Sequence, residues 1–113
     1  MTIKEKKYLF DILRSIELIE QHLEEVDSLF AYEQDIKSQD AVERRMIIIS
    51  EALRRLVETG VHLPQADRLI NRRNTIVHQY DQFLPEAIWR SVNRELPGLK
   101  YEVPQLLNDP PTS

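Results

Sequence analysis

The stretch VERRMIIISEALRRL, residues 42–56, contributes most to the expected fold. Its apolar residues recur every three or four positions, which is the pattern of one face of an amphipathic helix. This stripe consists of Val42, Met46, Ile49, Leu53 and Leu56. Ile47 and Ile48 widen it beyond what one face needs. The helix is therefore expected either to lie centrally in a bundle or to take part in an oligomer contact as well.

The ends of this helix carry their own signals. Ser38 has a side chain suited to an N-cap, and Gly60 suits a C-terminal stop. Glu51 interrupts the apolar region. We favour a structural interpretation, in which Glu51 is a solvated helix residue or forms an ion pair with Arg54 or Arg55, over a functional one, in which it orients an arginine of a functional site.

A second amphipathic helix is expected upstream, over residues 9–26, with His22 on its surface. Its inward residues are Leu9, Ile12, Leu13, Ile16, Ile19, Leu23 and Val26. Residues 28–37 lack periodicity and predict a loop or a short extra turn. Phe30 and Tyr32 are expected to hold this connection against the bundle.

Two further helices are expected downstream, beginning at Pro64 and Pro85, since proline suits the first turn of a helix. Pro97 and Gly98 are expected to break the last of these, and Pro104 to interrupt a short final helix. The prediction is an all-α, antiparallel four-helix bundle with a short additional C-terminal helix. One domain is expected over residues 1–107, followed by a flexible tail over residues 108–113.

Composition restricts the class of protein. The chain of 113 residues is 42% hydrophobic and 30% charged, with no cysteine, which suits a single globular domain without disulfides. The longest apolar run, residues 46–49, is too short to cross a membrane, and the N-terminus lacks a signal-peptide pattern, so a cytoplasmic protein is expected. A net charge of −4 argues against a surface that coats nucleic acid, although clustered arginines can still make a local positive groove.

Neither a metal site nor a nucleotide-binding loop is expected. The three histidines, His22, His62 and His78, are scattered, and no aspartate cluster has the spacing of a cation site. Gly60 and Gly98 are the only glycines, so no glycine-rich phosphate loop exists. These observations leave chemistry that needs no metal and no cofactor.

The densest polar chemistry is in NRRNTIVHQY, residues 71–80. Arg73 is a permanent cation that suits phosphate oxygens, and His78 can transfer protons near neutral pH. On an ideal helix the two side chains are about 140° apart. Either the helix distorts near Ile76, or an arginine of one subunit combines with a histidine of another. Asn74 lies one turn before His78 and can hydrogen-bond the imidazole or the substrate.

An arginine and a histidine suit metal-independent RNA cleavage. The RNA 2′-hydroxyl attacks the adjacent phosphate, His78 acts as general base or acid, and Arg73 neutralises the charge on the equatorial oxygens. Arg68 and Arg72 are further candidates for RNA contacts. From spacing alone, an interface ion-pair network in a noncatalytic helical dimer is at least as good an explanation.

The arrangement of Arg73, four residues, His78, one residue and Tyr80 resembles the signature of HepT-type toxins, which are HEPN-superfamily ribonucleases. Residues 40–52 are similar to that family's second helix, and Ile88-Trp89 with Leu96-Pro97 to its C-terminal part. The resemblance covers about residues 8–103. Ser50 stands where relatives usually have glycine, and Asn71-Arg72 where they usually have glycine-methionine.

The resemblance implies a HEPN-like homodimer whose catalytic residues, Arg73 and His78 supported by Asn74, line a cleft between subunits. It also implies a type VII-like toxin–antitoxin system, in which a cognate minimal nucleotidyltransferase (MNT) antitoxin uses ATP and Mg²⁺ to attach AMP to Tyr80. The alternative is a noncatalytic HEPN-like dimer that binds nucleotide or a protein partner.

Overall fold

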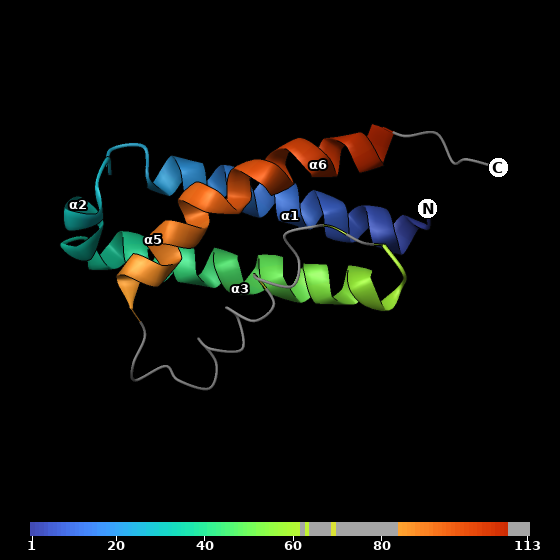
Figure 1. Cartoon of the computed structure of the whole chain (residues 1–113), viewed down its shortest axis with the longest axis horizontal. Coiled ribbons are helices and arrows are strands. Elements are labelled where there is room, and N and C mark those ends of the chain that lie inside the picture. The colour runs from blue at the N-terminus through green and yellow to red at the C-terminus, as the bar shows by residue number, and fades with distance from the viewer. Residues whose placement is uncertain (62, 64–68, 70–83, 109–113) are drawn as a thin grey trace.

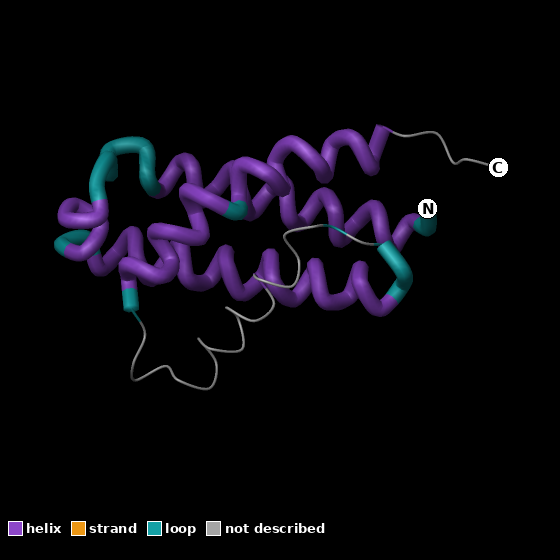
Figure 2. The backbone as a smooth tube through the Cα atoms, in the orientation of Figure 1, coloured by secondary structure: helices purple, strands orange, loops and turns teal. Residues whose placement is uncertain are grey.

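A computed structural model describes residues 1–61, 63, 69 and 84–108, and these form helices and connections without a strand (Figures 1 and 2). The helices are α1 (Ile3–His22), α2 (Leu29–Glu33), α3 (Ile36–Glu58), α5 (Pro85–Arg94) and α6 (Leu96–Asn108). The all-α prediction is confirmed. The helix expected from Pro64 lies outside the described residues, although Leu69 itself is helical. Of the tail expected over residues 108–113, residues 109–113 also lie outside them, while Asn108 is the last residue of α6. Within the described part, no helix has the length and apolar character that a membrane span requires.

The core is organised around α1 and α3, which run antiparallel along the long axis of the molecule (Figure 1). Both predicted stripes face this seam. Its buried side chains are Leu9, Ile12, Ile16 and Ile19 from α1, and Val42, Met46, Ile49, Leu53 and Leu56 from α3. The α6 helix packs on α1 and adds Leu96, Leu99 and Val103, while α5 contacts α2 and α6.

The α1 helix begins earlier and ends earlier than the expected span of residues 9–26. At its start, the Thr2 Oγ1 accepts a hydrogen bond from the Glu5 amide at 3.1 Å, and Glu5 Oε1 accepts one from the Thr2 amide at 2.8 Å. This reciprocal pair is a capping box, which satisfies amides that a helix start leaves unpaired. The bond from the Thr2 amide also lowers the pKa of Glu5. The helix ends at His22, which is exposed as predicted, so Leu23 and Val26 lie in the connection that follows.

The N-cap of α3 is Asp35, so the prediction of Ser38 was wrong. Asp35 Oδ1 accepts a hydrogen bond from the Ser38 amide at 3.0 Å, and its Oδ2 accepts one from the Ser38 hydroxyl at 2.7 Å. Both bonds favour the ionised carboxylate, which lowers the pKa of Asp35. Because its carboxylate accepts both bonds, Asp35 caps the helix, and Ser38 lies in the first turn of α3. The predicted stop at Gly60 is confirmed, because α3 ends at Glu58 and Gly60 has a φ of 94°, a conformation that glycine adopts readily.

The break in the C-terminal part comes before Pro97, not at Pro97-Gly98 as expected. The α5 helix ends at Arg94, and α6 runs from Leu96 through Pro97 and Pro104 to Asn108. Pro97 is in the first turn of α6, where a missing amide costs nothing. Pro104 does not interrupt α6, because burial of Leu99 and Val103 on its inner face offsets the helix-breaking effect of proline. With 13 residues, α6 is longer than the 10-residue α5.

The α2 helix is held against the bundle by Tyr32, whose side chain is fully buried. Its ring centroid lies 5.4 Å from that of Trp89 on α5. Phe30 is 74% exposed, so the prediction that it also holds this connection was wrong. The Tyr32 hydroxyl has no hydrogen-bond partner in the part of the chain that the structure describes. Burial raises the pKa of Tyr32, and the negative charges of Glu43, Asp35 and Asp40 raise it further.

We expect Tyr32→Phe to be as stable as the wild type at neutral pH, or more stable by up to about 1–3 kcal/mol. The reason is that the substitution removes a buried hydroxyl without a partner. Since the folded pKa is raised, unfolded Tyr32 loses its proton from about pH 10 while folded Tyr32 retains it. Wild-type stability should therefore fall above about pH 10, and the variant should lose less.

Urea unfolding at neutral pH and at about pH 10.5 measures both effects. Tyr101→Phe is the matched control, because Tyr101 is 70% exposed. A clear loss of stability in Tyr32→Phe at neutral pH would show that the hydroxyl makes a stabilising bond.

Candidate functional site

The predicted site residues all lie outside the described residues. These are Arg68, Arg72, Arg73, Asn74, His78 and Tyr80. Their relative positions on the helix expected from Pro64 therefore stay predictions. The structure describes residues that precede and follow this segment in the sequence, and the helices to which they belong.

The chain that leads into the motif is anchored in the core. Leu63 is 2% exposed and Leu69 is fully buried, and both belong to the main apolar cluster. Leu69 is two residues before Asn71 and four before Arg73. On the far side of the motif, Leu84 is 55% exposed and serves as the N-cap residue of α5 without a side-chain hydrogen bond. The described anchoring is therefore stronger before the motif than after it.

Ser50, in the middle of α3, is in hydrogen-bonding contact with Leu69. Its hydroxyl lies 2.7 Å from the Leu69 carbonyl oxygen and 2.9 Å from that of Met46, both within hydrogen-bonding distance. Ser50 is 1% exposed, so water does not compete for this contact. Ser50 is also the position where glycine was expected from the family pattern. This serine therefore provides a buried hydrogen bond to Leu69, which precedes Asn71 by two positions in the sequence.

A group of charged side chains follows Ser50 on α3. Glu51 Oε1 accepts a hydrogen bond from Arg54 at 2.7 Å and lies 3.6 Å from Arg55 Nε, while Arg54 also pairs with Glu58 at 3.7 Å. Of the two structural interpretations of Glu51, the structure therefore shows the ion pair. The Glu51 carboxylate raises the pKa of Arg54. A role of Glu51 in orienting an arginine of the motif is not tested by these contacts.

The outer face of α3 combines charge with half-buried isoleucines. One hollow of about 490 Å³ is lined by Asp40, Glu43, Arg44, Ile47 and Ile48. Another, of about 460 Å³, brings Ile48, Glu51 and Arg55 together with Lys4, Tyr8 and Asp11 of α1. Burial raises the pKa of Glu43, and Asp40 raises it further.

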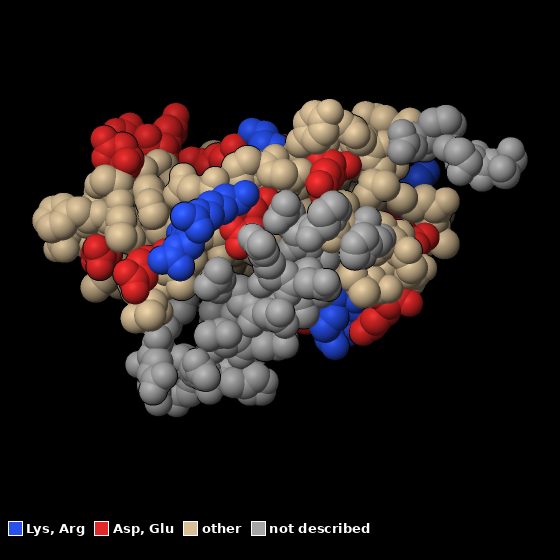
Figure 3. Space-filling view, viewed as in Figure 1, with Lys and Arg blue, Asp and Glu red and all other residues tan. Residues whose placement is uncertain are grey.

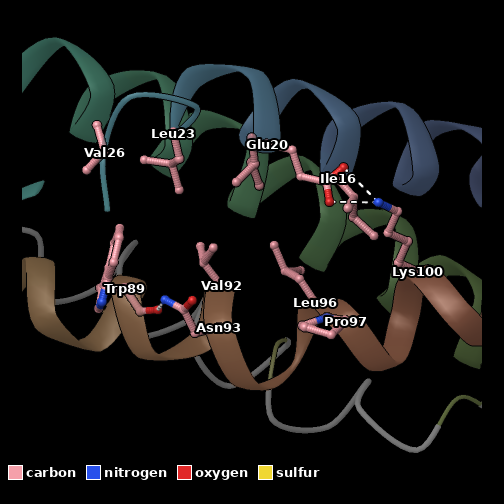
Figure 4. A pocket seen from close by; sticks show the side chains of 11 residues that line it. Ile16, Glu20, Leu23, Val26, Trp89, Val92, Asn93, Leu96, Pro97 and Lys100 are labelled. Atoms are coloured by element: carbon pink, nitrogen blue, oxygen red, sulfur yellow. Dashed lines mark hydrogen bonds and ion pairs between the residues drawn. The ribbon is translucent and has the colours of Figure 1, made fainter. Parts of the chain in front are cut away.

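A separate groove of about 530 Å³ lies between α1 and the α5–α6 segment (Figure 4). Ile16, Leu23, Trp89 and Val92 are among its apolar walls. The charged residues that line it are bonded to one another, with Lys100 Nζ 2.8 Å and 3.0 Å from the two Glu20 carboxylate oxygens. The groove lacks α3 residues, so it is distinct from the surroundings of Ser50.

Cations on the described surface are distributed unevenly. Figure 3 shows a band of Lys and Arg side chains over α5, bordered by acidic side chains. Arg90 and Arg94 are the exposed cations of this helix, one turn apart. No cluster of histidine, aspartate and glutamate that suits a metal ion occurs among the described residues.

The described architecture is an all-α domain built on a long antiparallel helix pair. Ser50 of α3 hydrogen-bonds to Leu69, which precedes an arginine–histidine–tyrosine motif in the sequence. The family model described as "Ribonuclease HepT-like" matches residues 12–106. The chain therefore belongs to the HepT-like ribonuclease family. The resemblance drawn from the motif is thereby confirmed.

Two relatives extend this comparison. The chain is 33% identical over 101 residues to a protein of Thermococcus cleftensis named "Probable ribonuclease HepT", covering 84% of this chain and 88% of that protein. It is 32% identical over 110 residues to a protein of Methanocaldococcus jannaschii described as a gamma-glutamylcyclotransferase and putative RNase. That match covers 92% of this chain but only 48% of the relative, so the chain spans about half the length of that protein. No solved structure gives a significant match.

Proposed function

We propose that this protein is a metal-independent endoribonuclease and the toxin of a HEPN/MNT toxin–antitoxin pair. The observation that carries the proposal is the motif of Arg73, His78 and Tyr80 inside the region matched by the HepT-like ribonuclease family. The names of the two relatives support ribonuclease activity as the general class.

In the proposed reaction, the RNA 2′-oxygen bonds to the adjacent phosphorus and the bond from phosphorus to the 5′-oxygen breaks. His78 either takes the proton of the 2′-hydroxyl or delivers a proton to the leaving 5′-oxygen, and water carries out the other of these two proton transfers. Arg73 donates hydrogen bonds to the equatorial phosphate oxygens, whose charge grows in the transition state, and Asn74 orients the imidazole or the substrate. The products are a 2′,3′-cyclic phosphate and a 5′-hydroxyl.

Arg73→Ala and His78→Ala should each abolish RNA cleavage and growth inhibition. Loss of two charge-assisted contacts of the arginine costs about 3 to 6 kcal/mol in the transition state, which lowers the rate by about 150-fold or more. Cleavage of a labelled RNA by purified protein measures this loss directly. Circular dichroism of each variant verifies that the helices remain folded.

Three controls define the reaction class. A DNA strand of the same sequence should resist cleavage because it lacks the attacking hydroxyl, and a chelator should leave the rate unchanged. Arg90 lies on the surface of α5 and outside the motif, so Arg90→Ala should still cleave RNA. RNA cleavage that survives in folded His78→Ala would instead favour the noncatalytic HEPN-like dimer.

We further propose that the catalytic cleft lies between two subunits of a homodimer. A rotation of about 140° separates Arg73 from His78 on an ideal helix, so one straight helix does not bring both side chains to one phosphate. The outer face of α3, with Ile47 and Ile48 half-buried in the monomer, supports a contact of this kind.

Mixing inactive variants tests the shared cleft. Arg73→Ala and His78→Ala subunits, unfolded together and refolded, should recover about a quarter of wild-type activity, since half of the dimers are mixed and each has one intact site. Each variant refolded alone should stay inactive. No recovery despite mixed dimers, detected by two affinity tags, would place Arg73 and His78 of one subunit in the same site.

Tyr80 is the proposed control point. A partner nucleotidyltransferase would transfer AMP from ATP, with Mg²⁺ bound to that enzyme: the Tyr80 oxygen bonds to the α-phosphorus, loses its proton, and pyrophosphate leaves. The adenylyl group adds a negative charge and a purine two residues from His78. It can pair with Arg73 and exclude the RNA phosphate by charge and by volume.

Tyr80→Phe should remain toxic and should escape neutralisation by the partner, because the accepting hydroxyl is absent. Intact-protein mass spectrometry after coexpression should show one or more AMP units on the wild type and none on Tyr80→Phe. Tyr101→Phe, which changes a tyrosine 70% exposed on α6, should be modified like the wild type. An unmodified Tyr80 in a fully neutralised complex would show that the partner inhibits by binding alone.

A further inference from the structure

We propose that the chain binds a second copy of itself by contact between two different surfaces, a basic face of α1 and an acidic end of the molecule around α2. The acidic end is residues 24–36, and the basic face consists of Ile3, Lys6, Lys7, Phe10 and Arg14. The contact goes beyond the proposed function, because neither surface includes a proposed catalytic residue. It is also separate from the outer face of α3, on which the proposed homodimer depends.

Both surfaces expose large apolar side chains. On the basic face, Ile3 is 88% and Phe10 is 58% exposed, and the seven positions between them put both on one side of α1. At the acidic end, Phe30 is 74% and Ile36 is 70% exposed. Contact between the surfaces would remove this apolar area from water, which favours association.

The acidic end concentrates the negative charge of the chain. Residues 24–36 contain five of the 19 acidic residues and no lysine, arginine or histidine. Glu24, Glu25, Asp27 and Glu33 are exposed, and none of them forms an ion pair within the described residues. Figure 3 shows acidic side chains beside the tan surface at the α2 end. The rest of the chain has 15 cationic and 14 acidic residues, so the net charge of −4 arises in this segment.

The basic face carries the cations that these carboxylates need. Lys6 has no ion-pair partner in the part of the chain that the structure describes. Lys7 Nζ lies 3.0 Å from Asp11 Oδ2, and Arg14 Nη1 lies 3.6 Å from Glu17 Oε2. The side chains of both pairs are largely exposed to water, so each pair is weak and its cation can also meet a carboxylate of a partner.

The placement of the two surfaces makes a second copy the occupant that fits. They lie toward opposite ends of α1, a helix of 20 residues and about 30 Å, so they do not meet within one molecule (Figure 1). A second copy offers a basic face to the acidic end, with apolar side chains on both sides of the contact. Because the contact joins two different surfaces, it extends into a chain of copies or closes into a ring.

Sedimentation of the wild type at two salt concentrations tests the contact. In about 50 mM NaCl, the mean mass should rise between about 5 and 500 μM protein, above the mass found in about 500 mM NaCl, because salt screens the charges of both surfaces. The high-salt species serves as the reference whether it is a monomer or the proposed dimer. The outcome therefore does not depend on the dimer or on ribonuclease activity.

Two charge reversals locate the contact. Lys6→Glu/Lys7→Glu changes the basic face, and Glu24→Lys/Glu25→Lys changes the acidic end. Both suit the dipole of α1, which favours acidic residues near its start and cations next to its end, so folding is retained. Each variant alone should lose the rise in mass, with a dissociation constant raised about tenfold or more. A mixture of the two should regain the rise, because each variant supplies the surface that the other lacks.

Matched controls separate the contact from an effect of net charge or of exposed aromatic area. Arg90→Glu/Arg94→Glu, on α5, changes the net charge as much as the reversal of the basic face and should associate like the wild type. Phe10→Ala should weaken association, whereas Tyr101→Ala, on α6 and outside both surfaces, should not. Circular dichroism verifies that each variant remains helical.

Three results would overturn the inference. They are a wild-type mass that stays constant at low salt, folded reversal variants that associate like the wild type, and a mixture of the two variants that does not regain association.

Discussion

The aliphatic seam between α1 and α3 is the interaction on which the other elements depend. Each large side chain buried there contributes about 1.5–3 kcal/mol relative to an exposed position, and the seam extends through several turns of both helices. The α6 helix adds to it from the α1 side, and Leu69 contributes to the same core. Ser50 lies on α3, so the packing of this helix also positions the hydroxyl that bonds to the Leu69 carbonyl oxygen.

The fold class followed from periodicity, while helix ends depended on contacts that periodicity does not contain. The stripes of both long helices were predicted correctly as far as Ile19 in α1 and Leu56 in α3, because burial against a neighbour requires a spacing of three and four residues. Ser38 and Asp35 are both good N-cap residues, and the choice rests on the two bonds that Asp35 accepts. Pro104 disfavours a helix locally, but the tertiary burial of Val103 prevails.

The functional site was predictable only in part. Arg73, His78 and Tyr80 are recognisable because their chemistry and spacing match a reaction and a family, but their geometry lies outside the described residues. Ser50 departs from the family pattern, and the sequence indicates no contact for it. Its bond to Leu69 required the structure, since no sequence pattern indicates that a hydroxyl in α3 lies 2.7 Å from a carbonyl oxygen 19 residues away.

The tilted ring contact between Tyr32 and Trp89 has a practical consequence. The chain has a single tryptophan, and its ring both contacts Tyr32 of α2 and lines the groove between α1 and the α5–α6 segment. Its fluorescence emission therefore comes from one known place. Loss of energy transfer from Tyr32 would report separation of α2 from α5, and a spectral shift would report a change of polarity in the groove. The protein thus carries an intrinsic optical probe of its scaffold, located outside the motif segment.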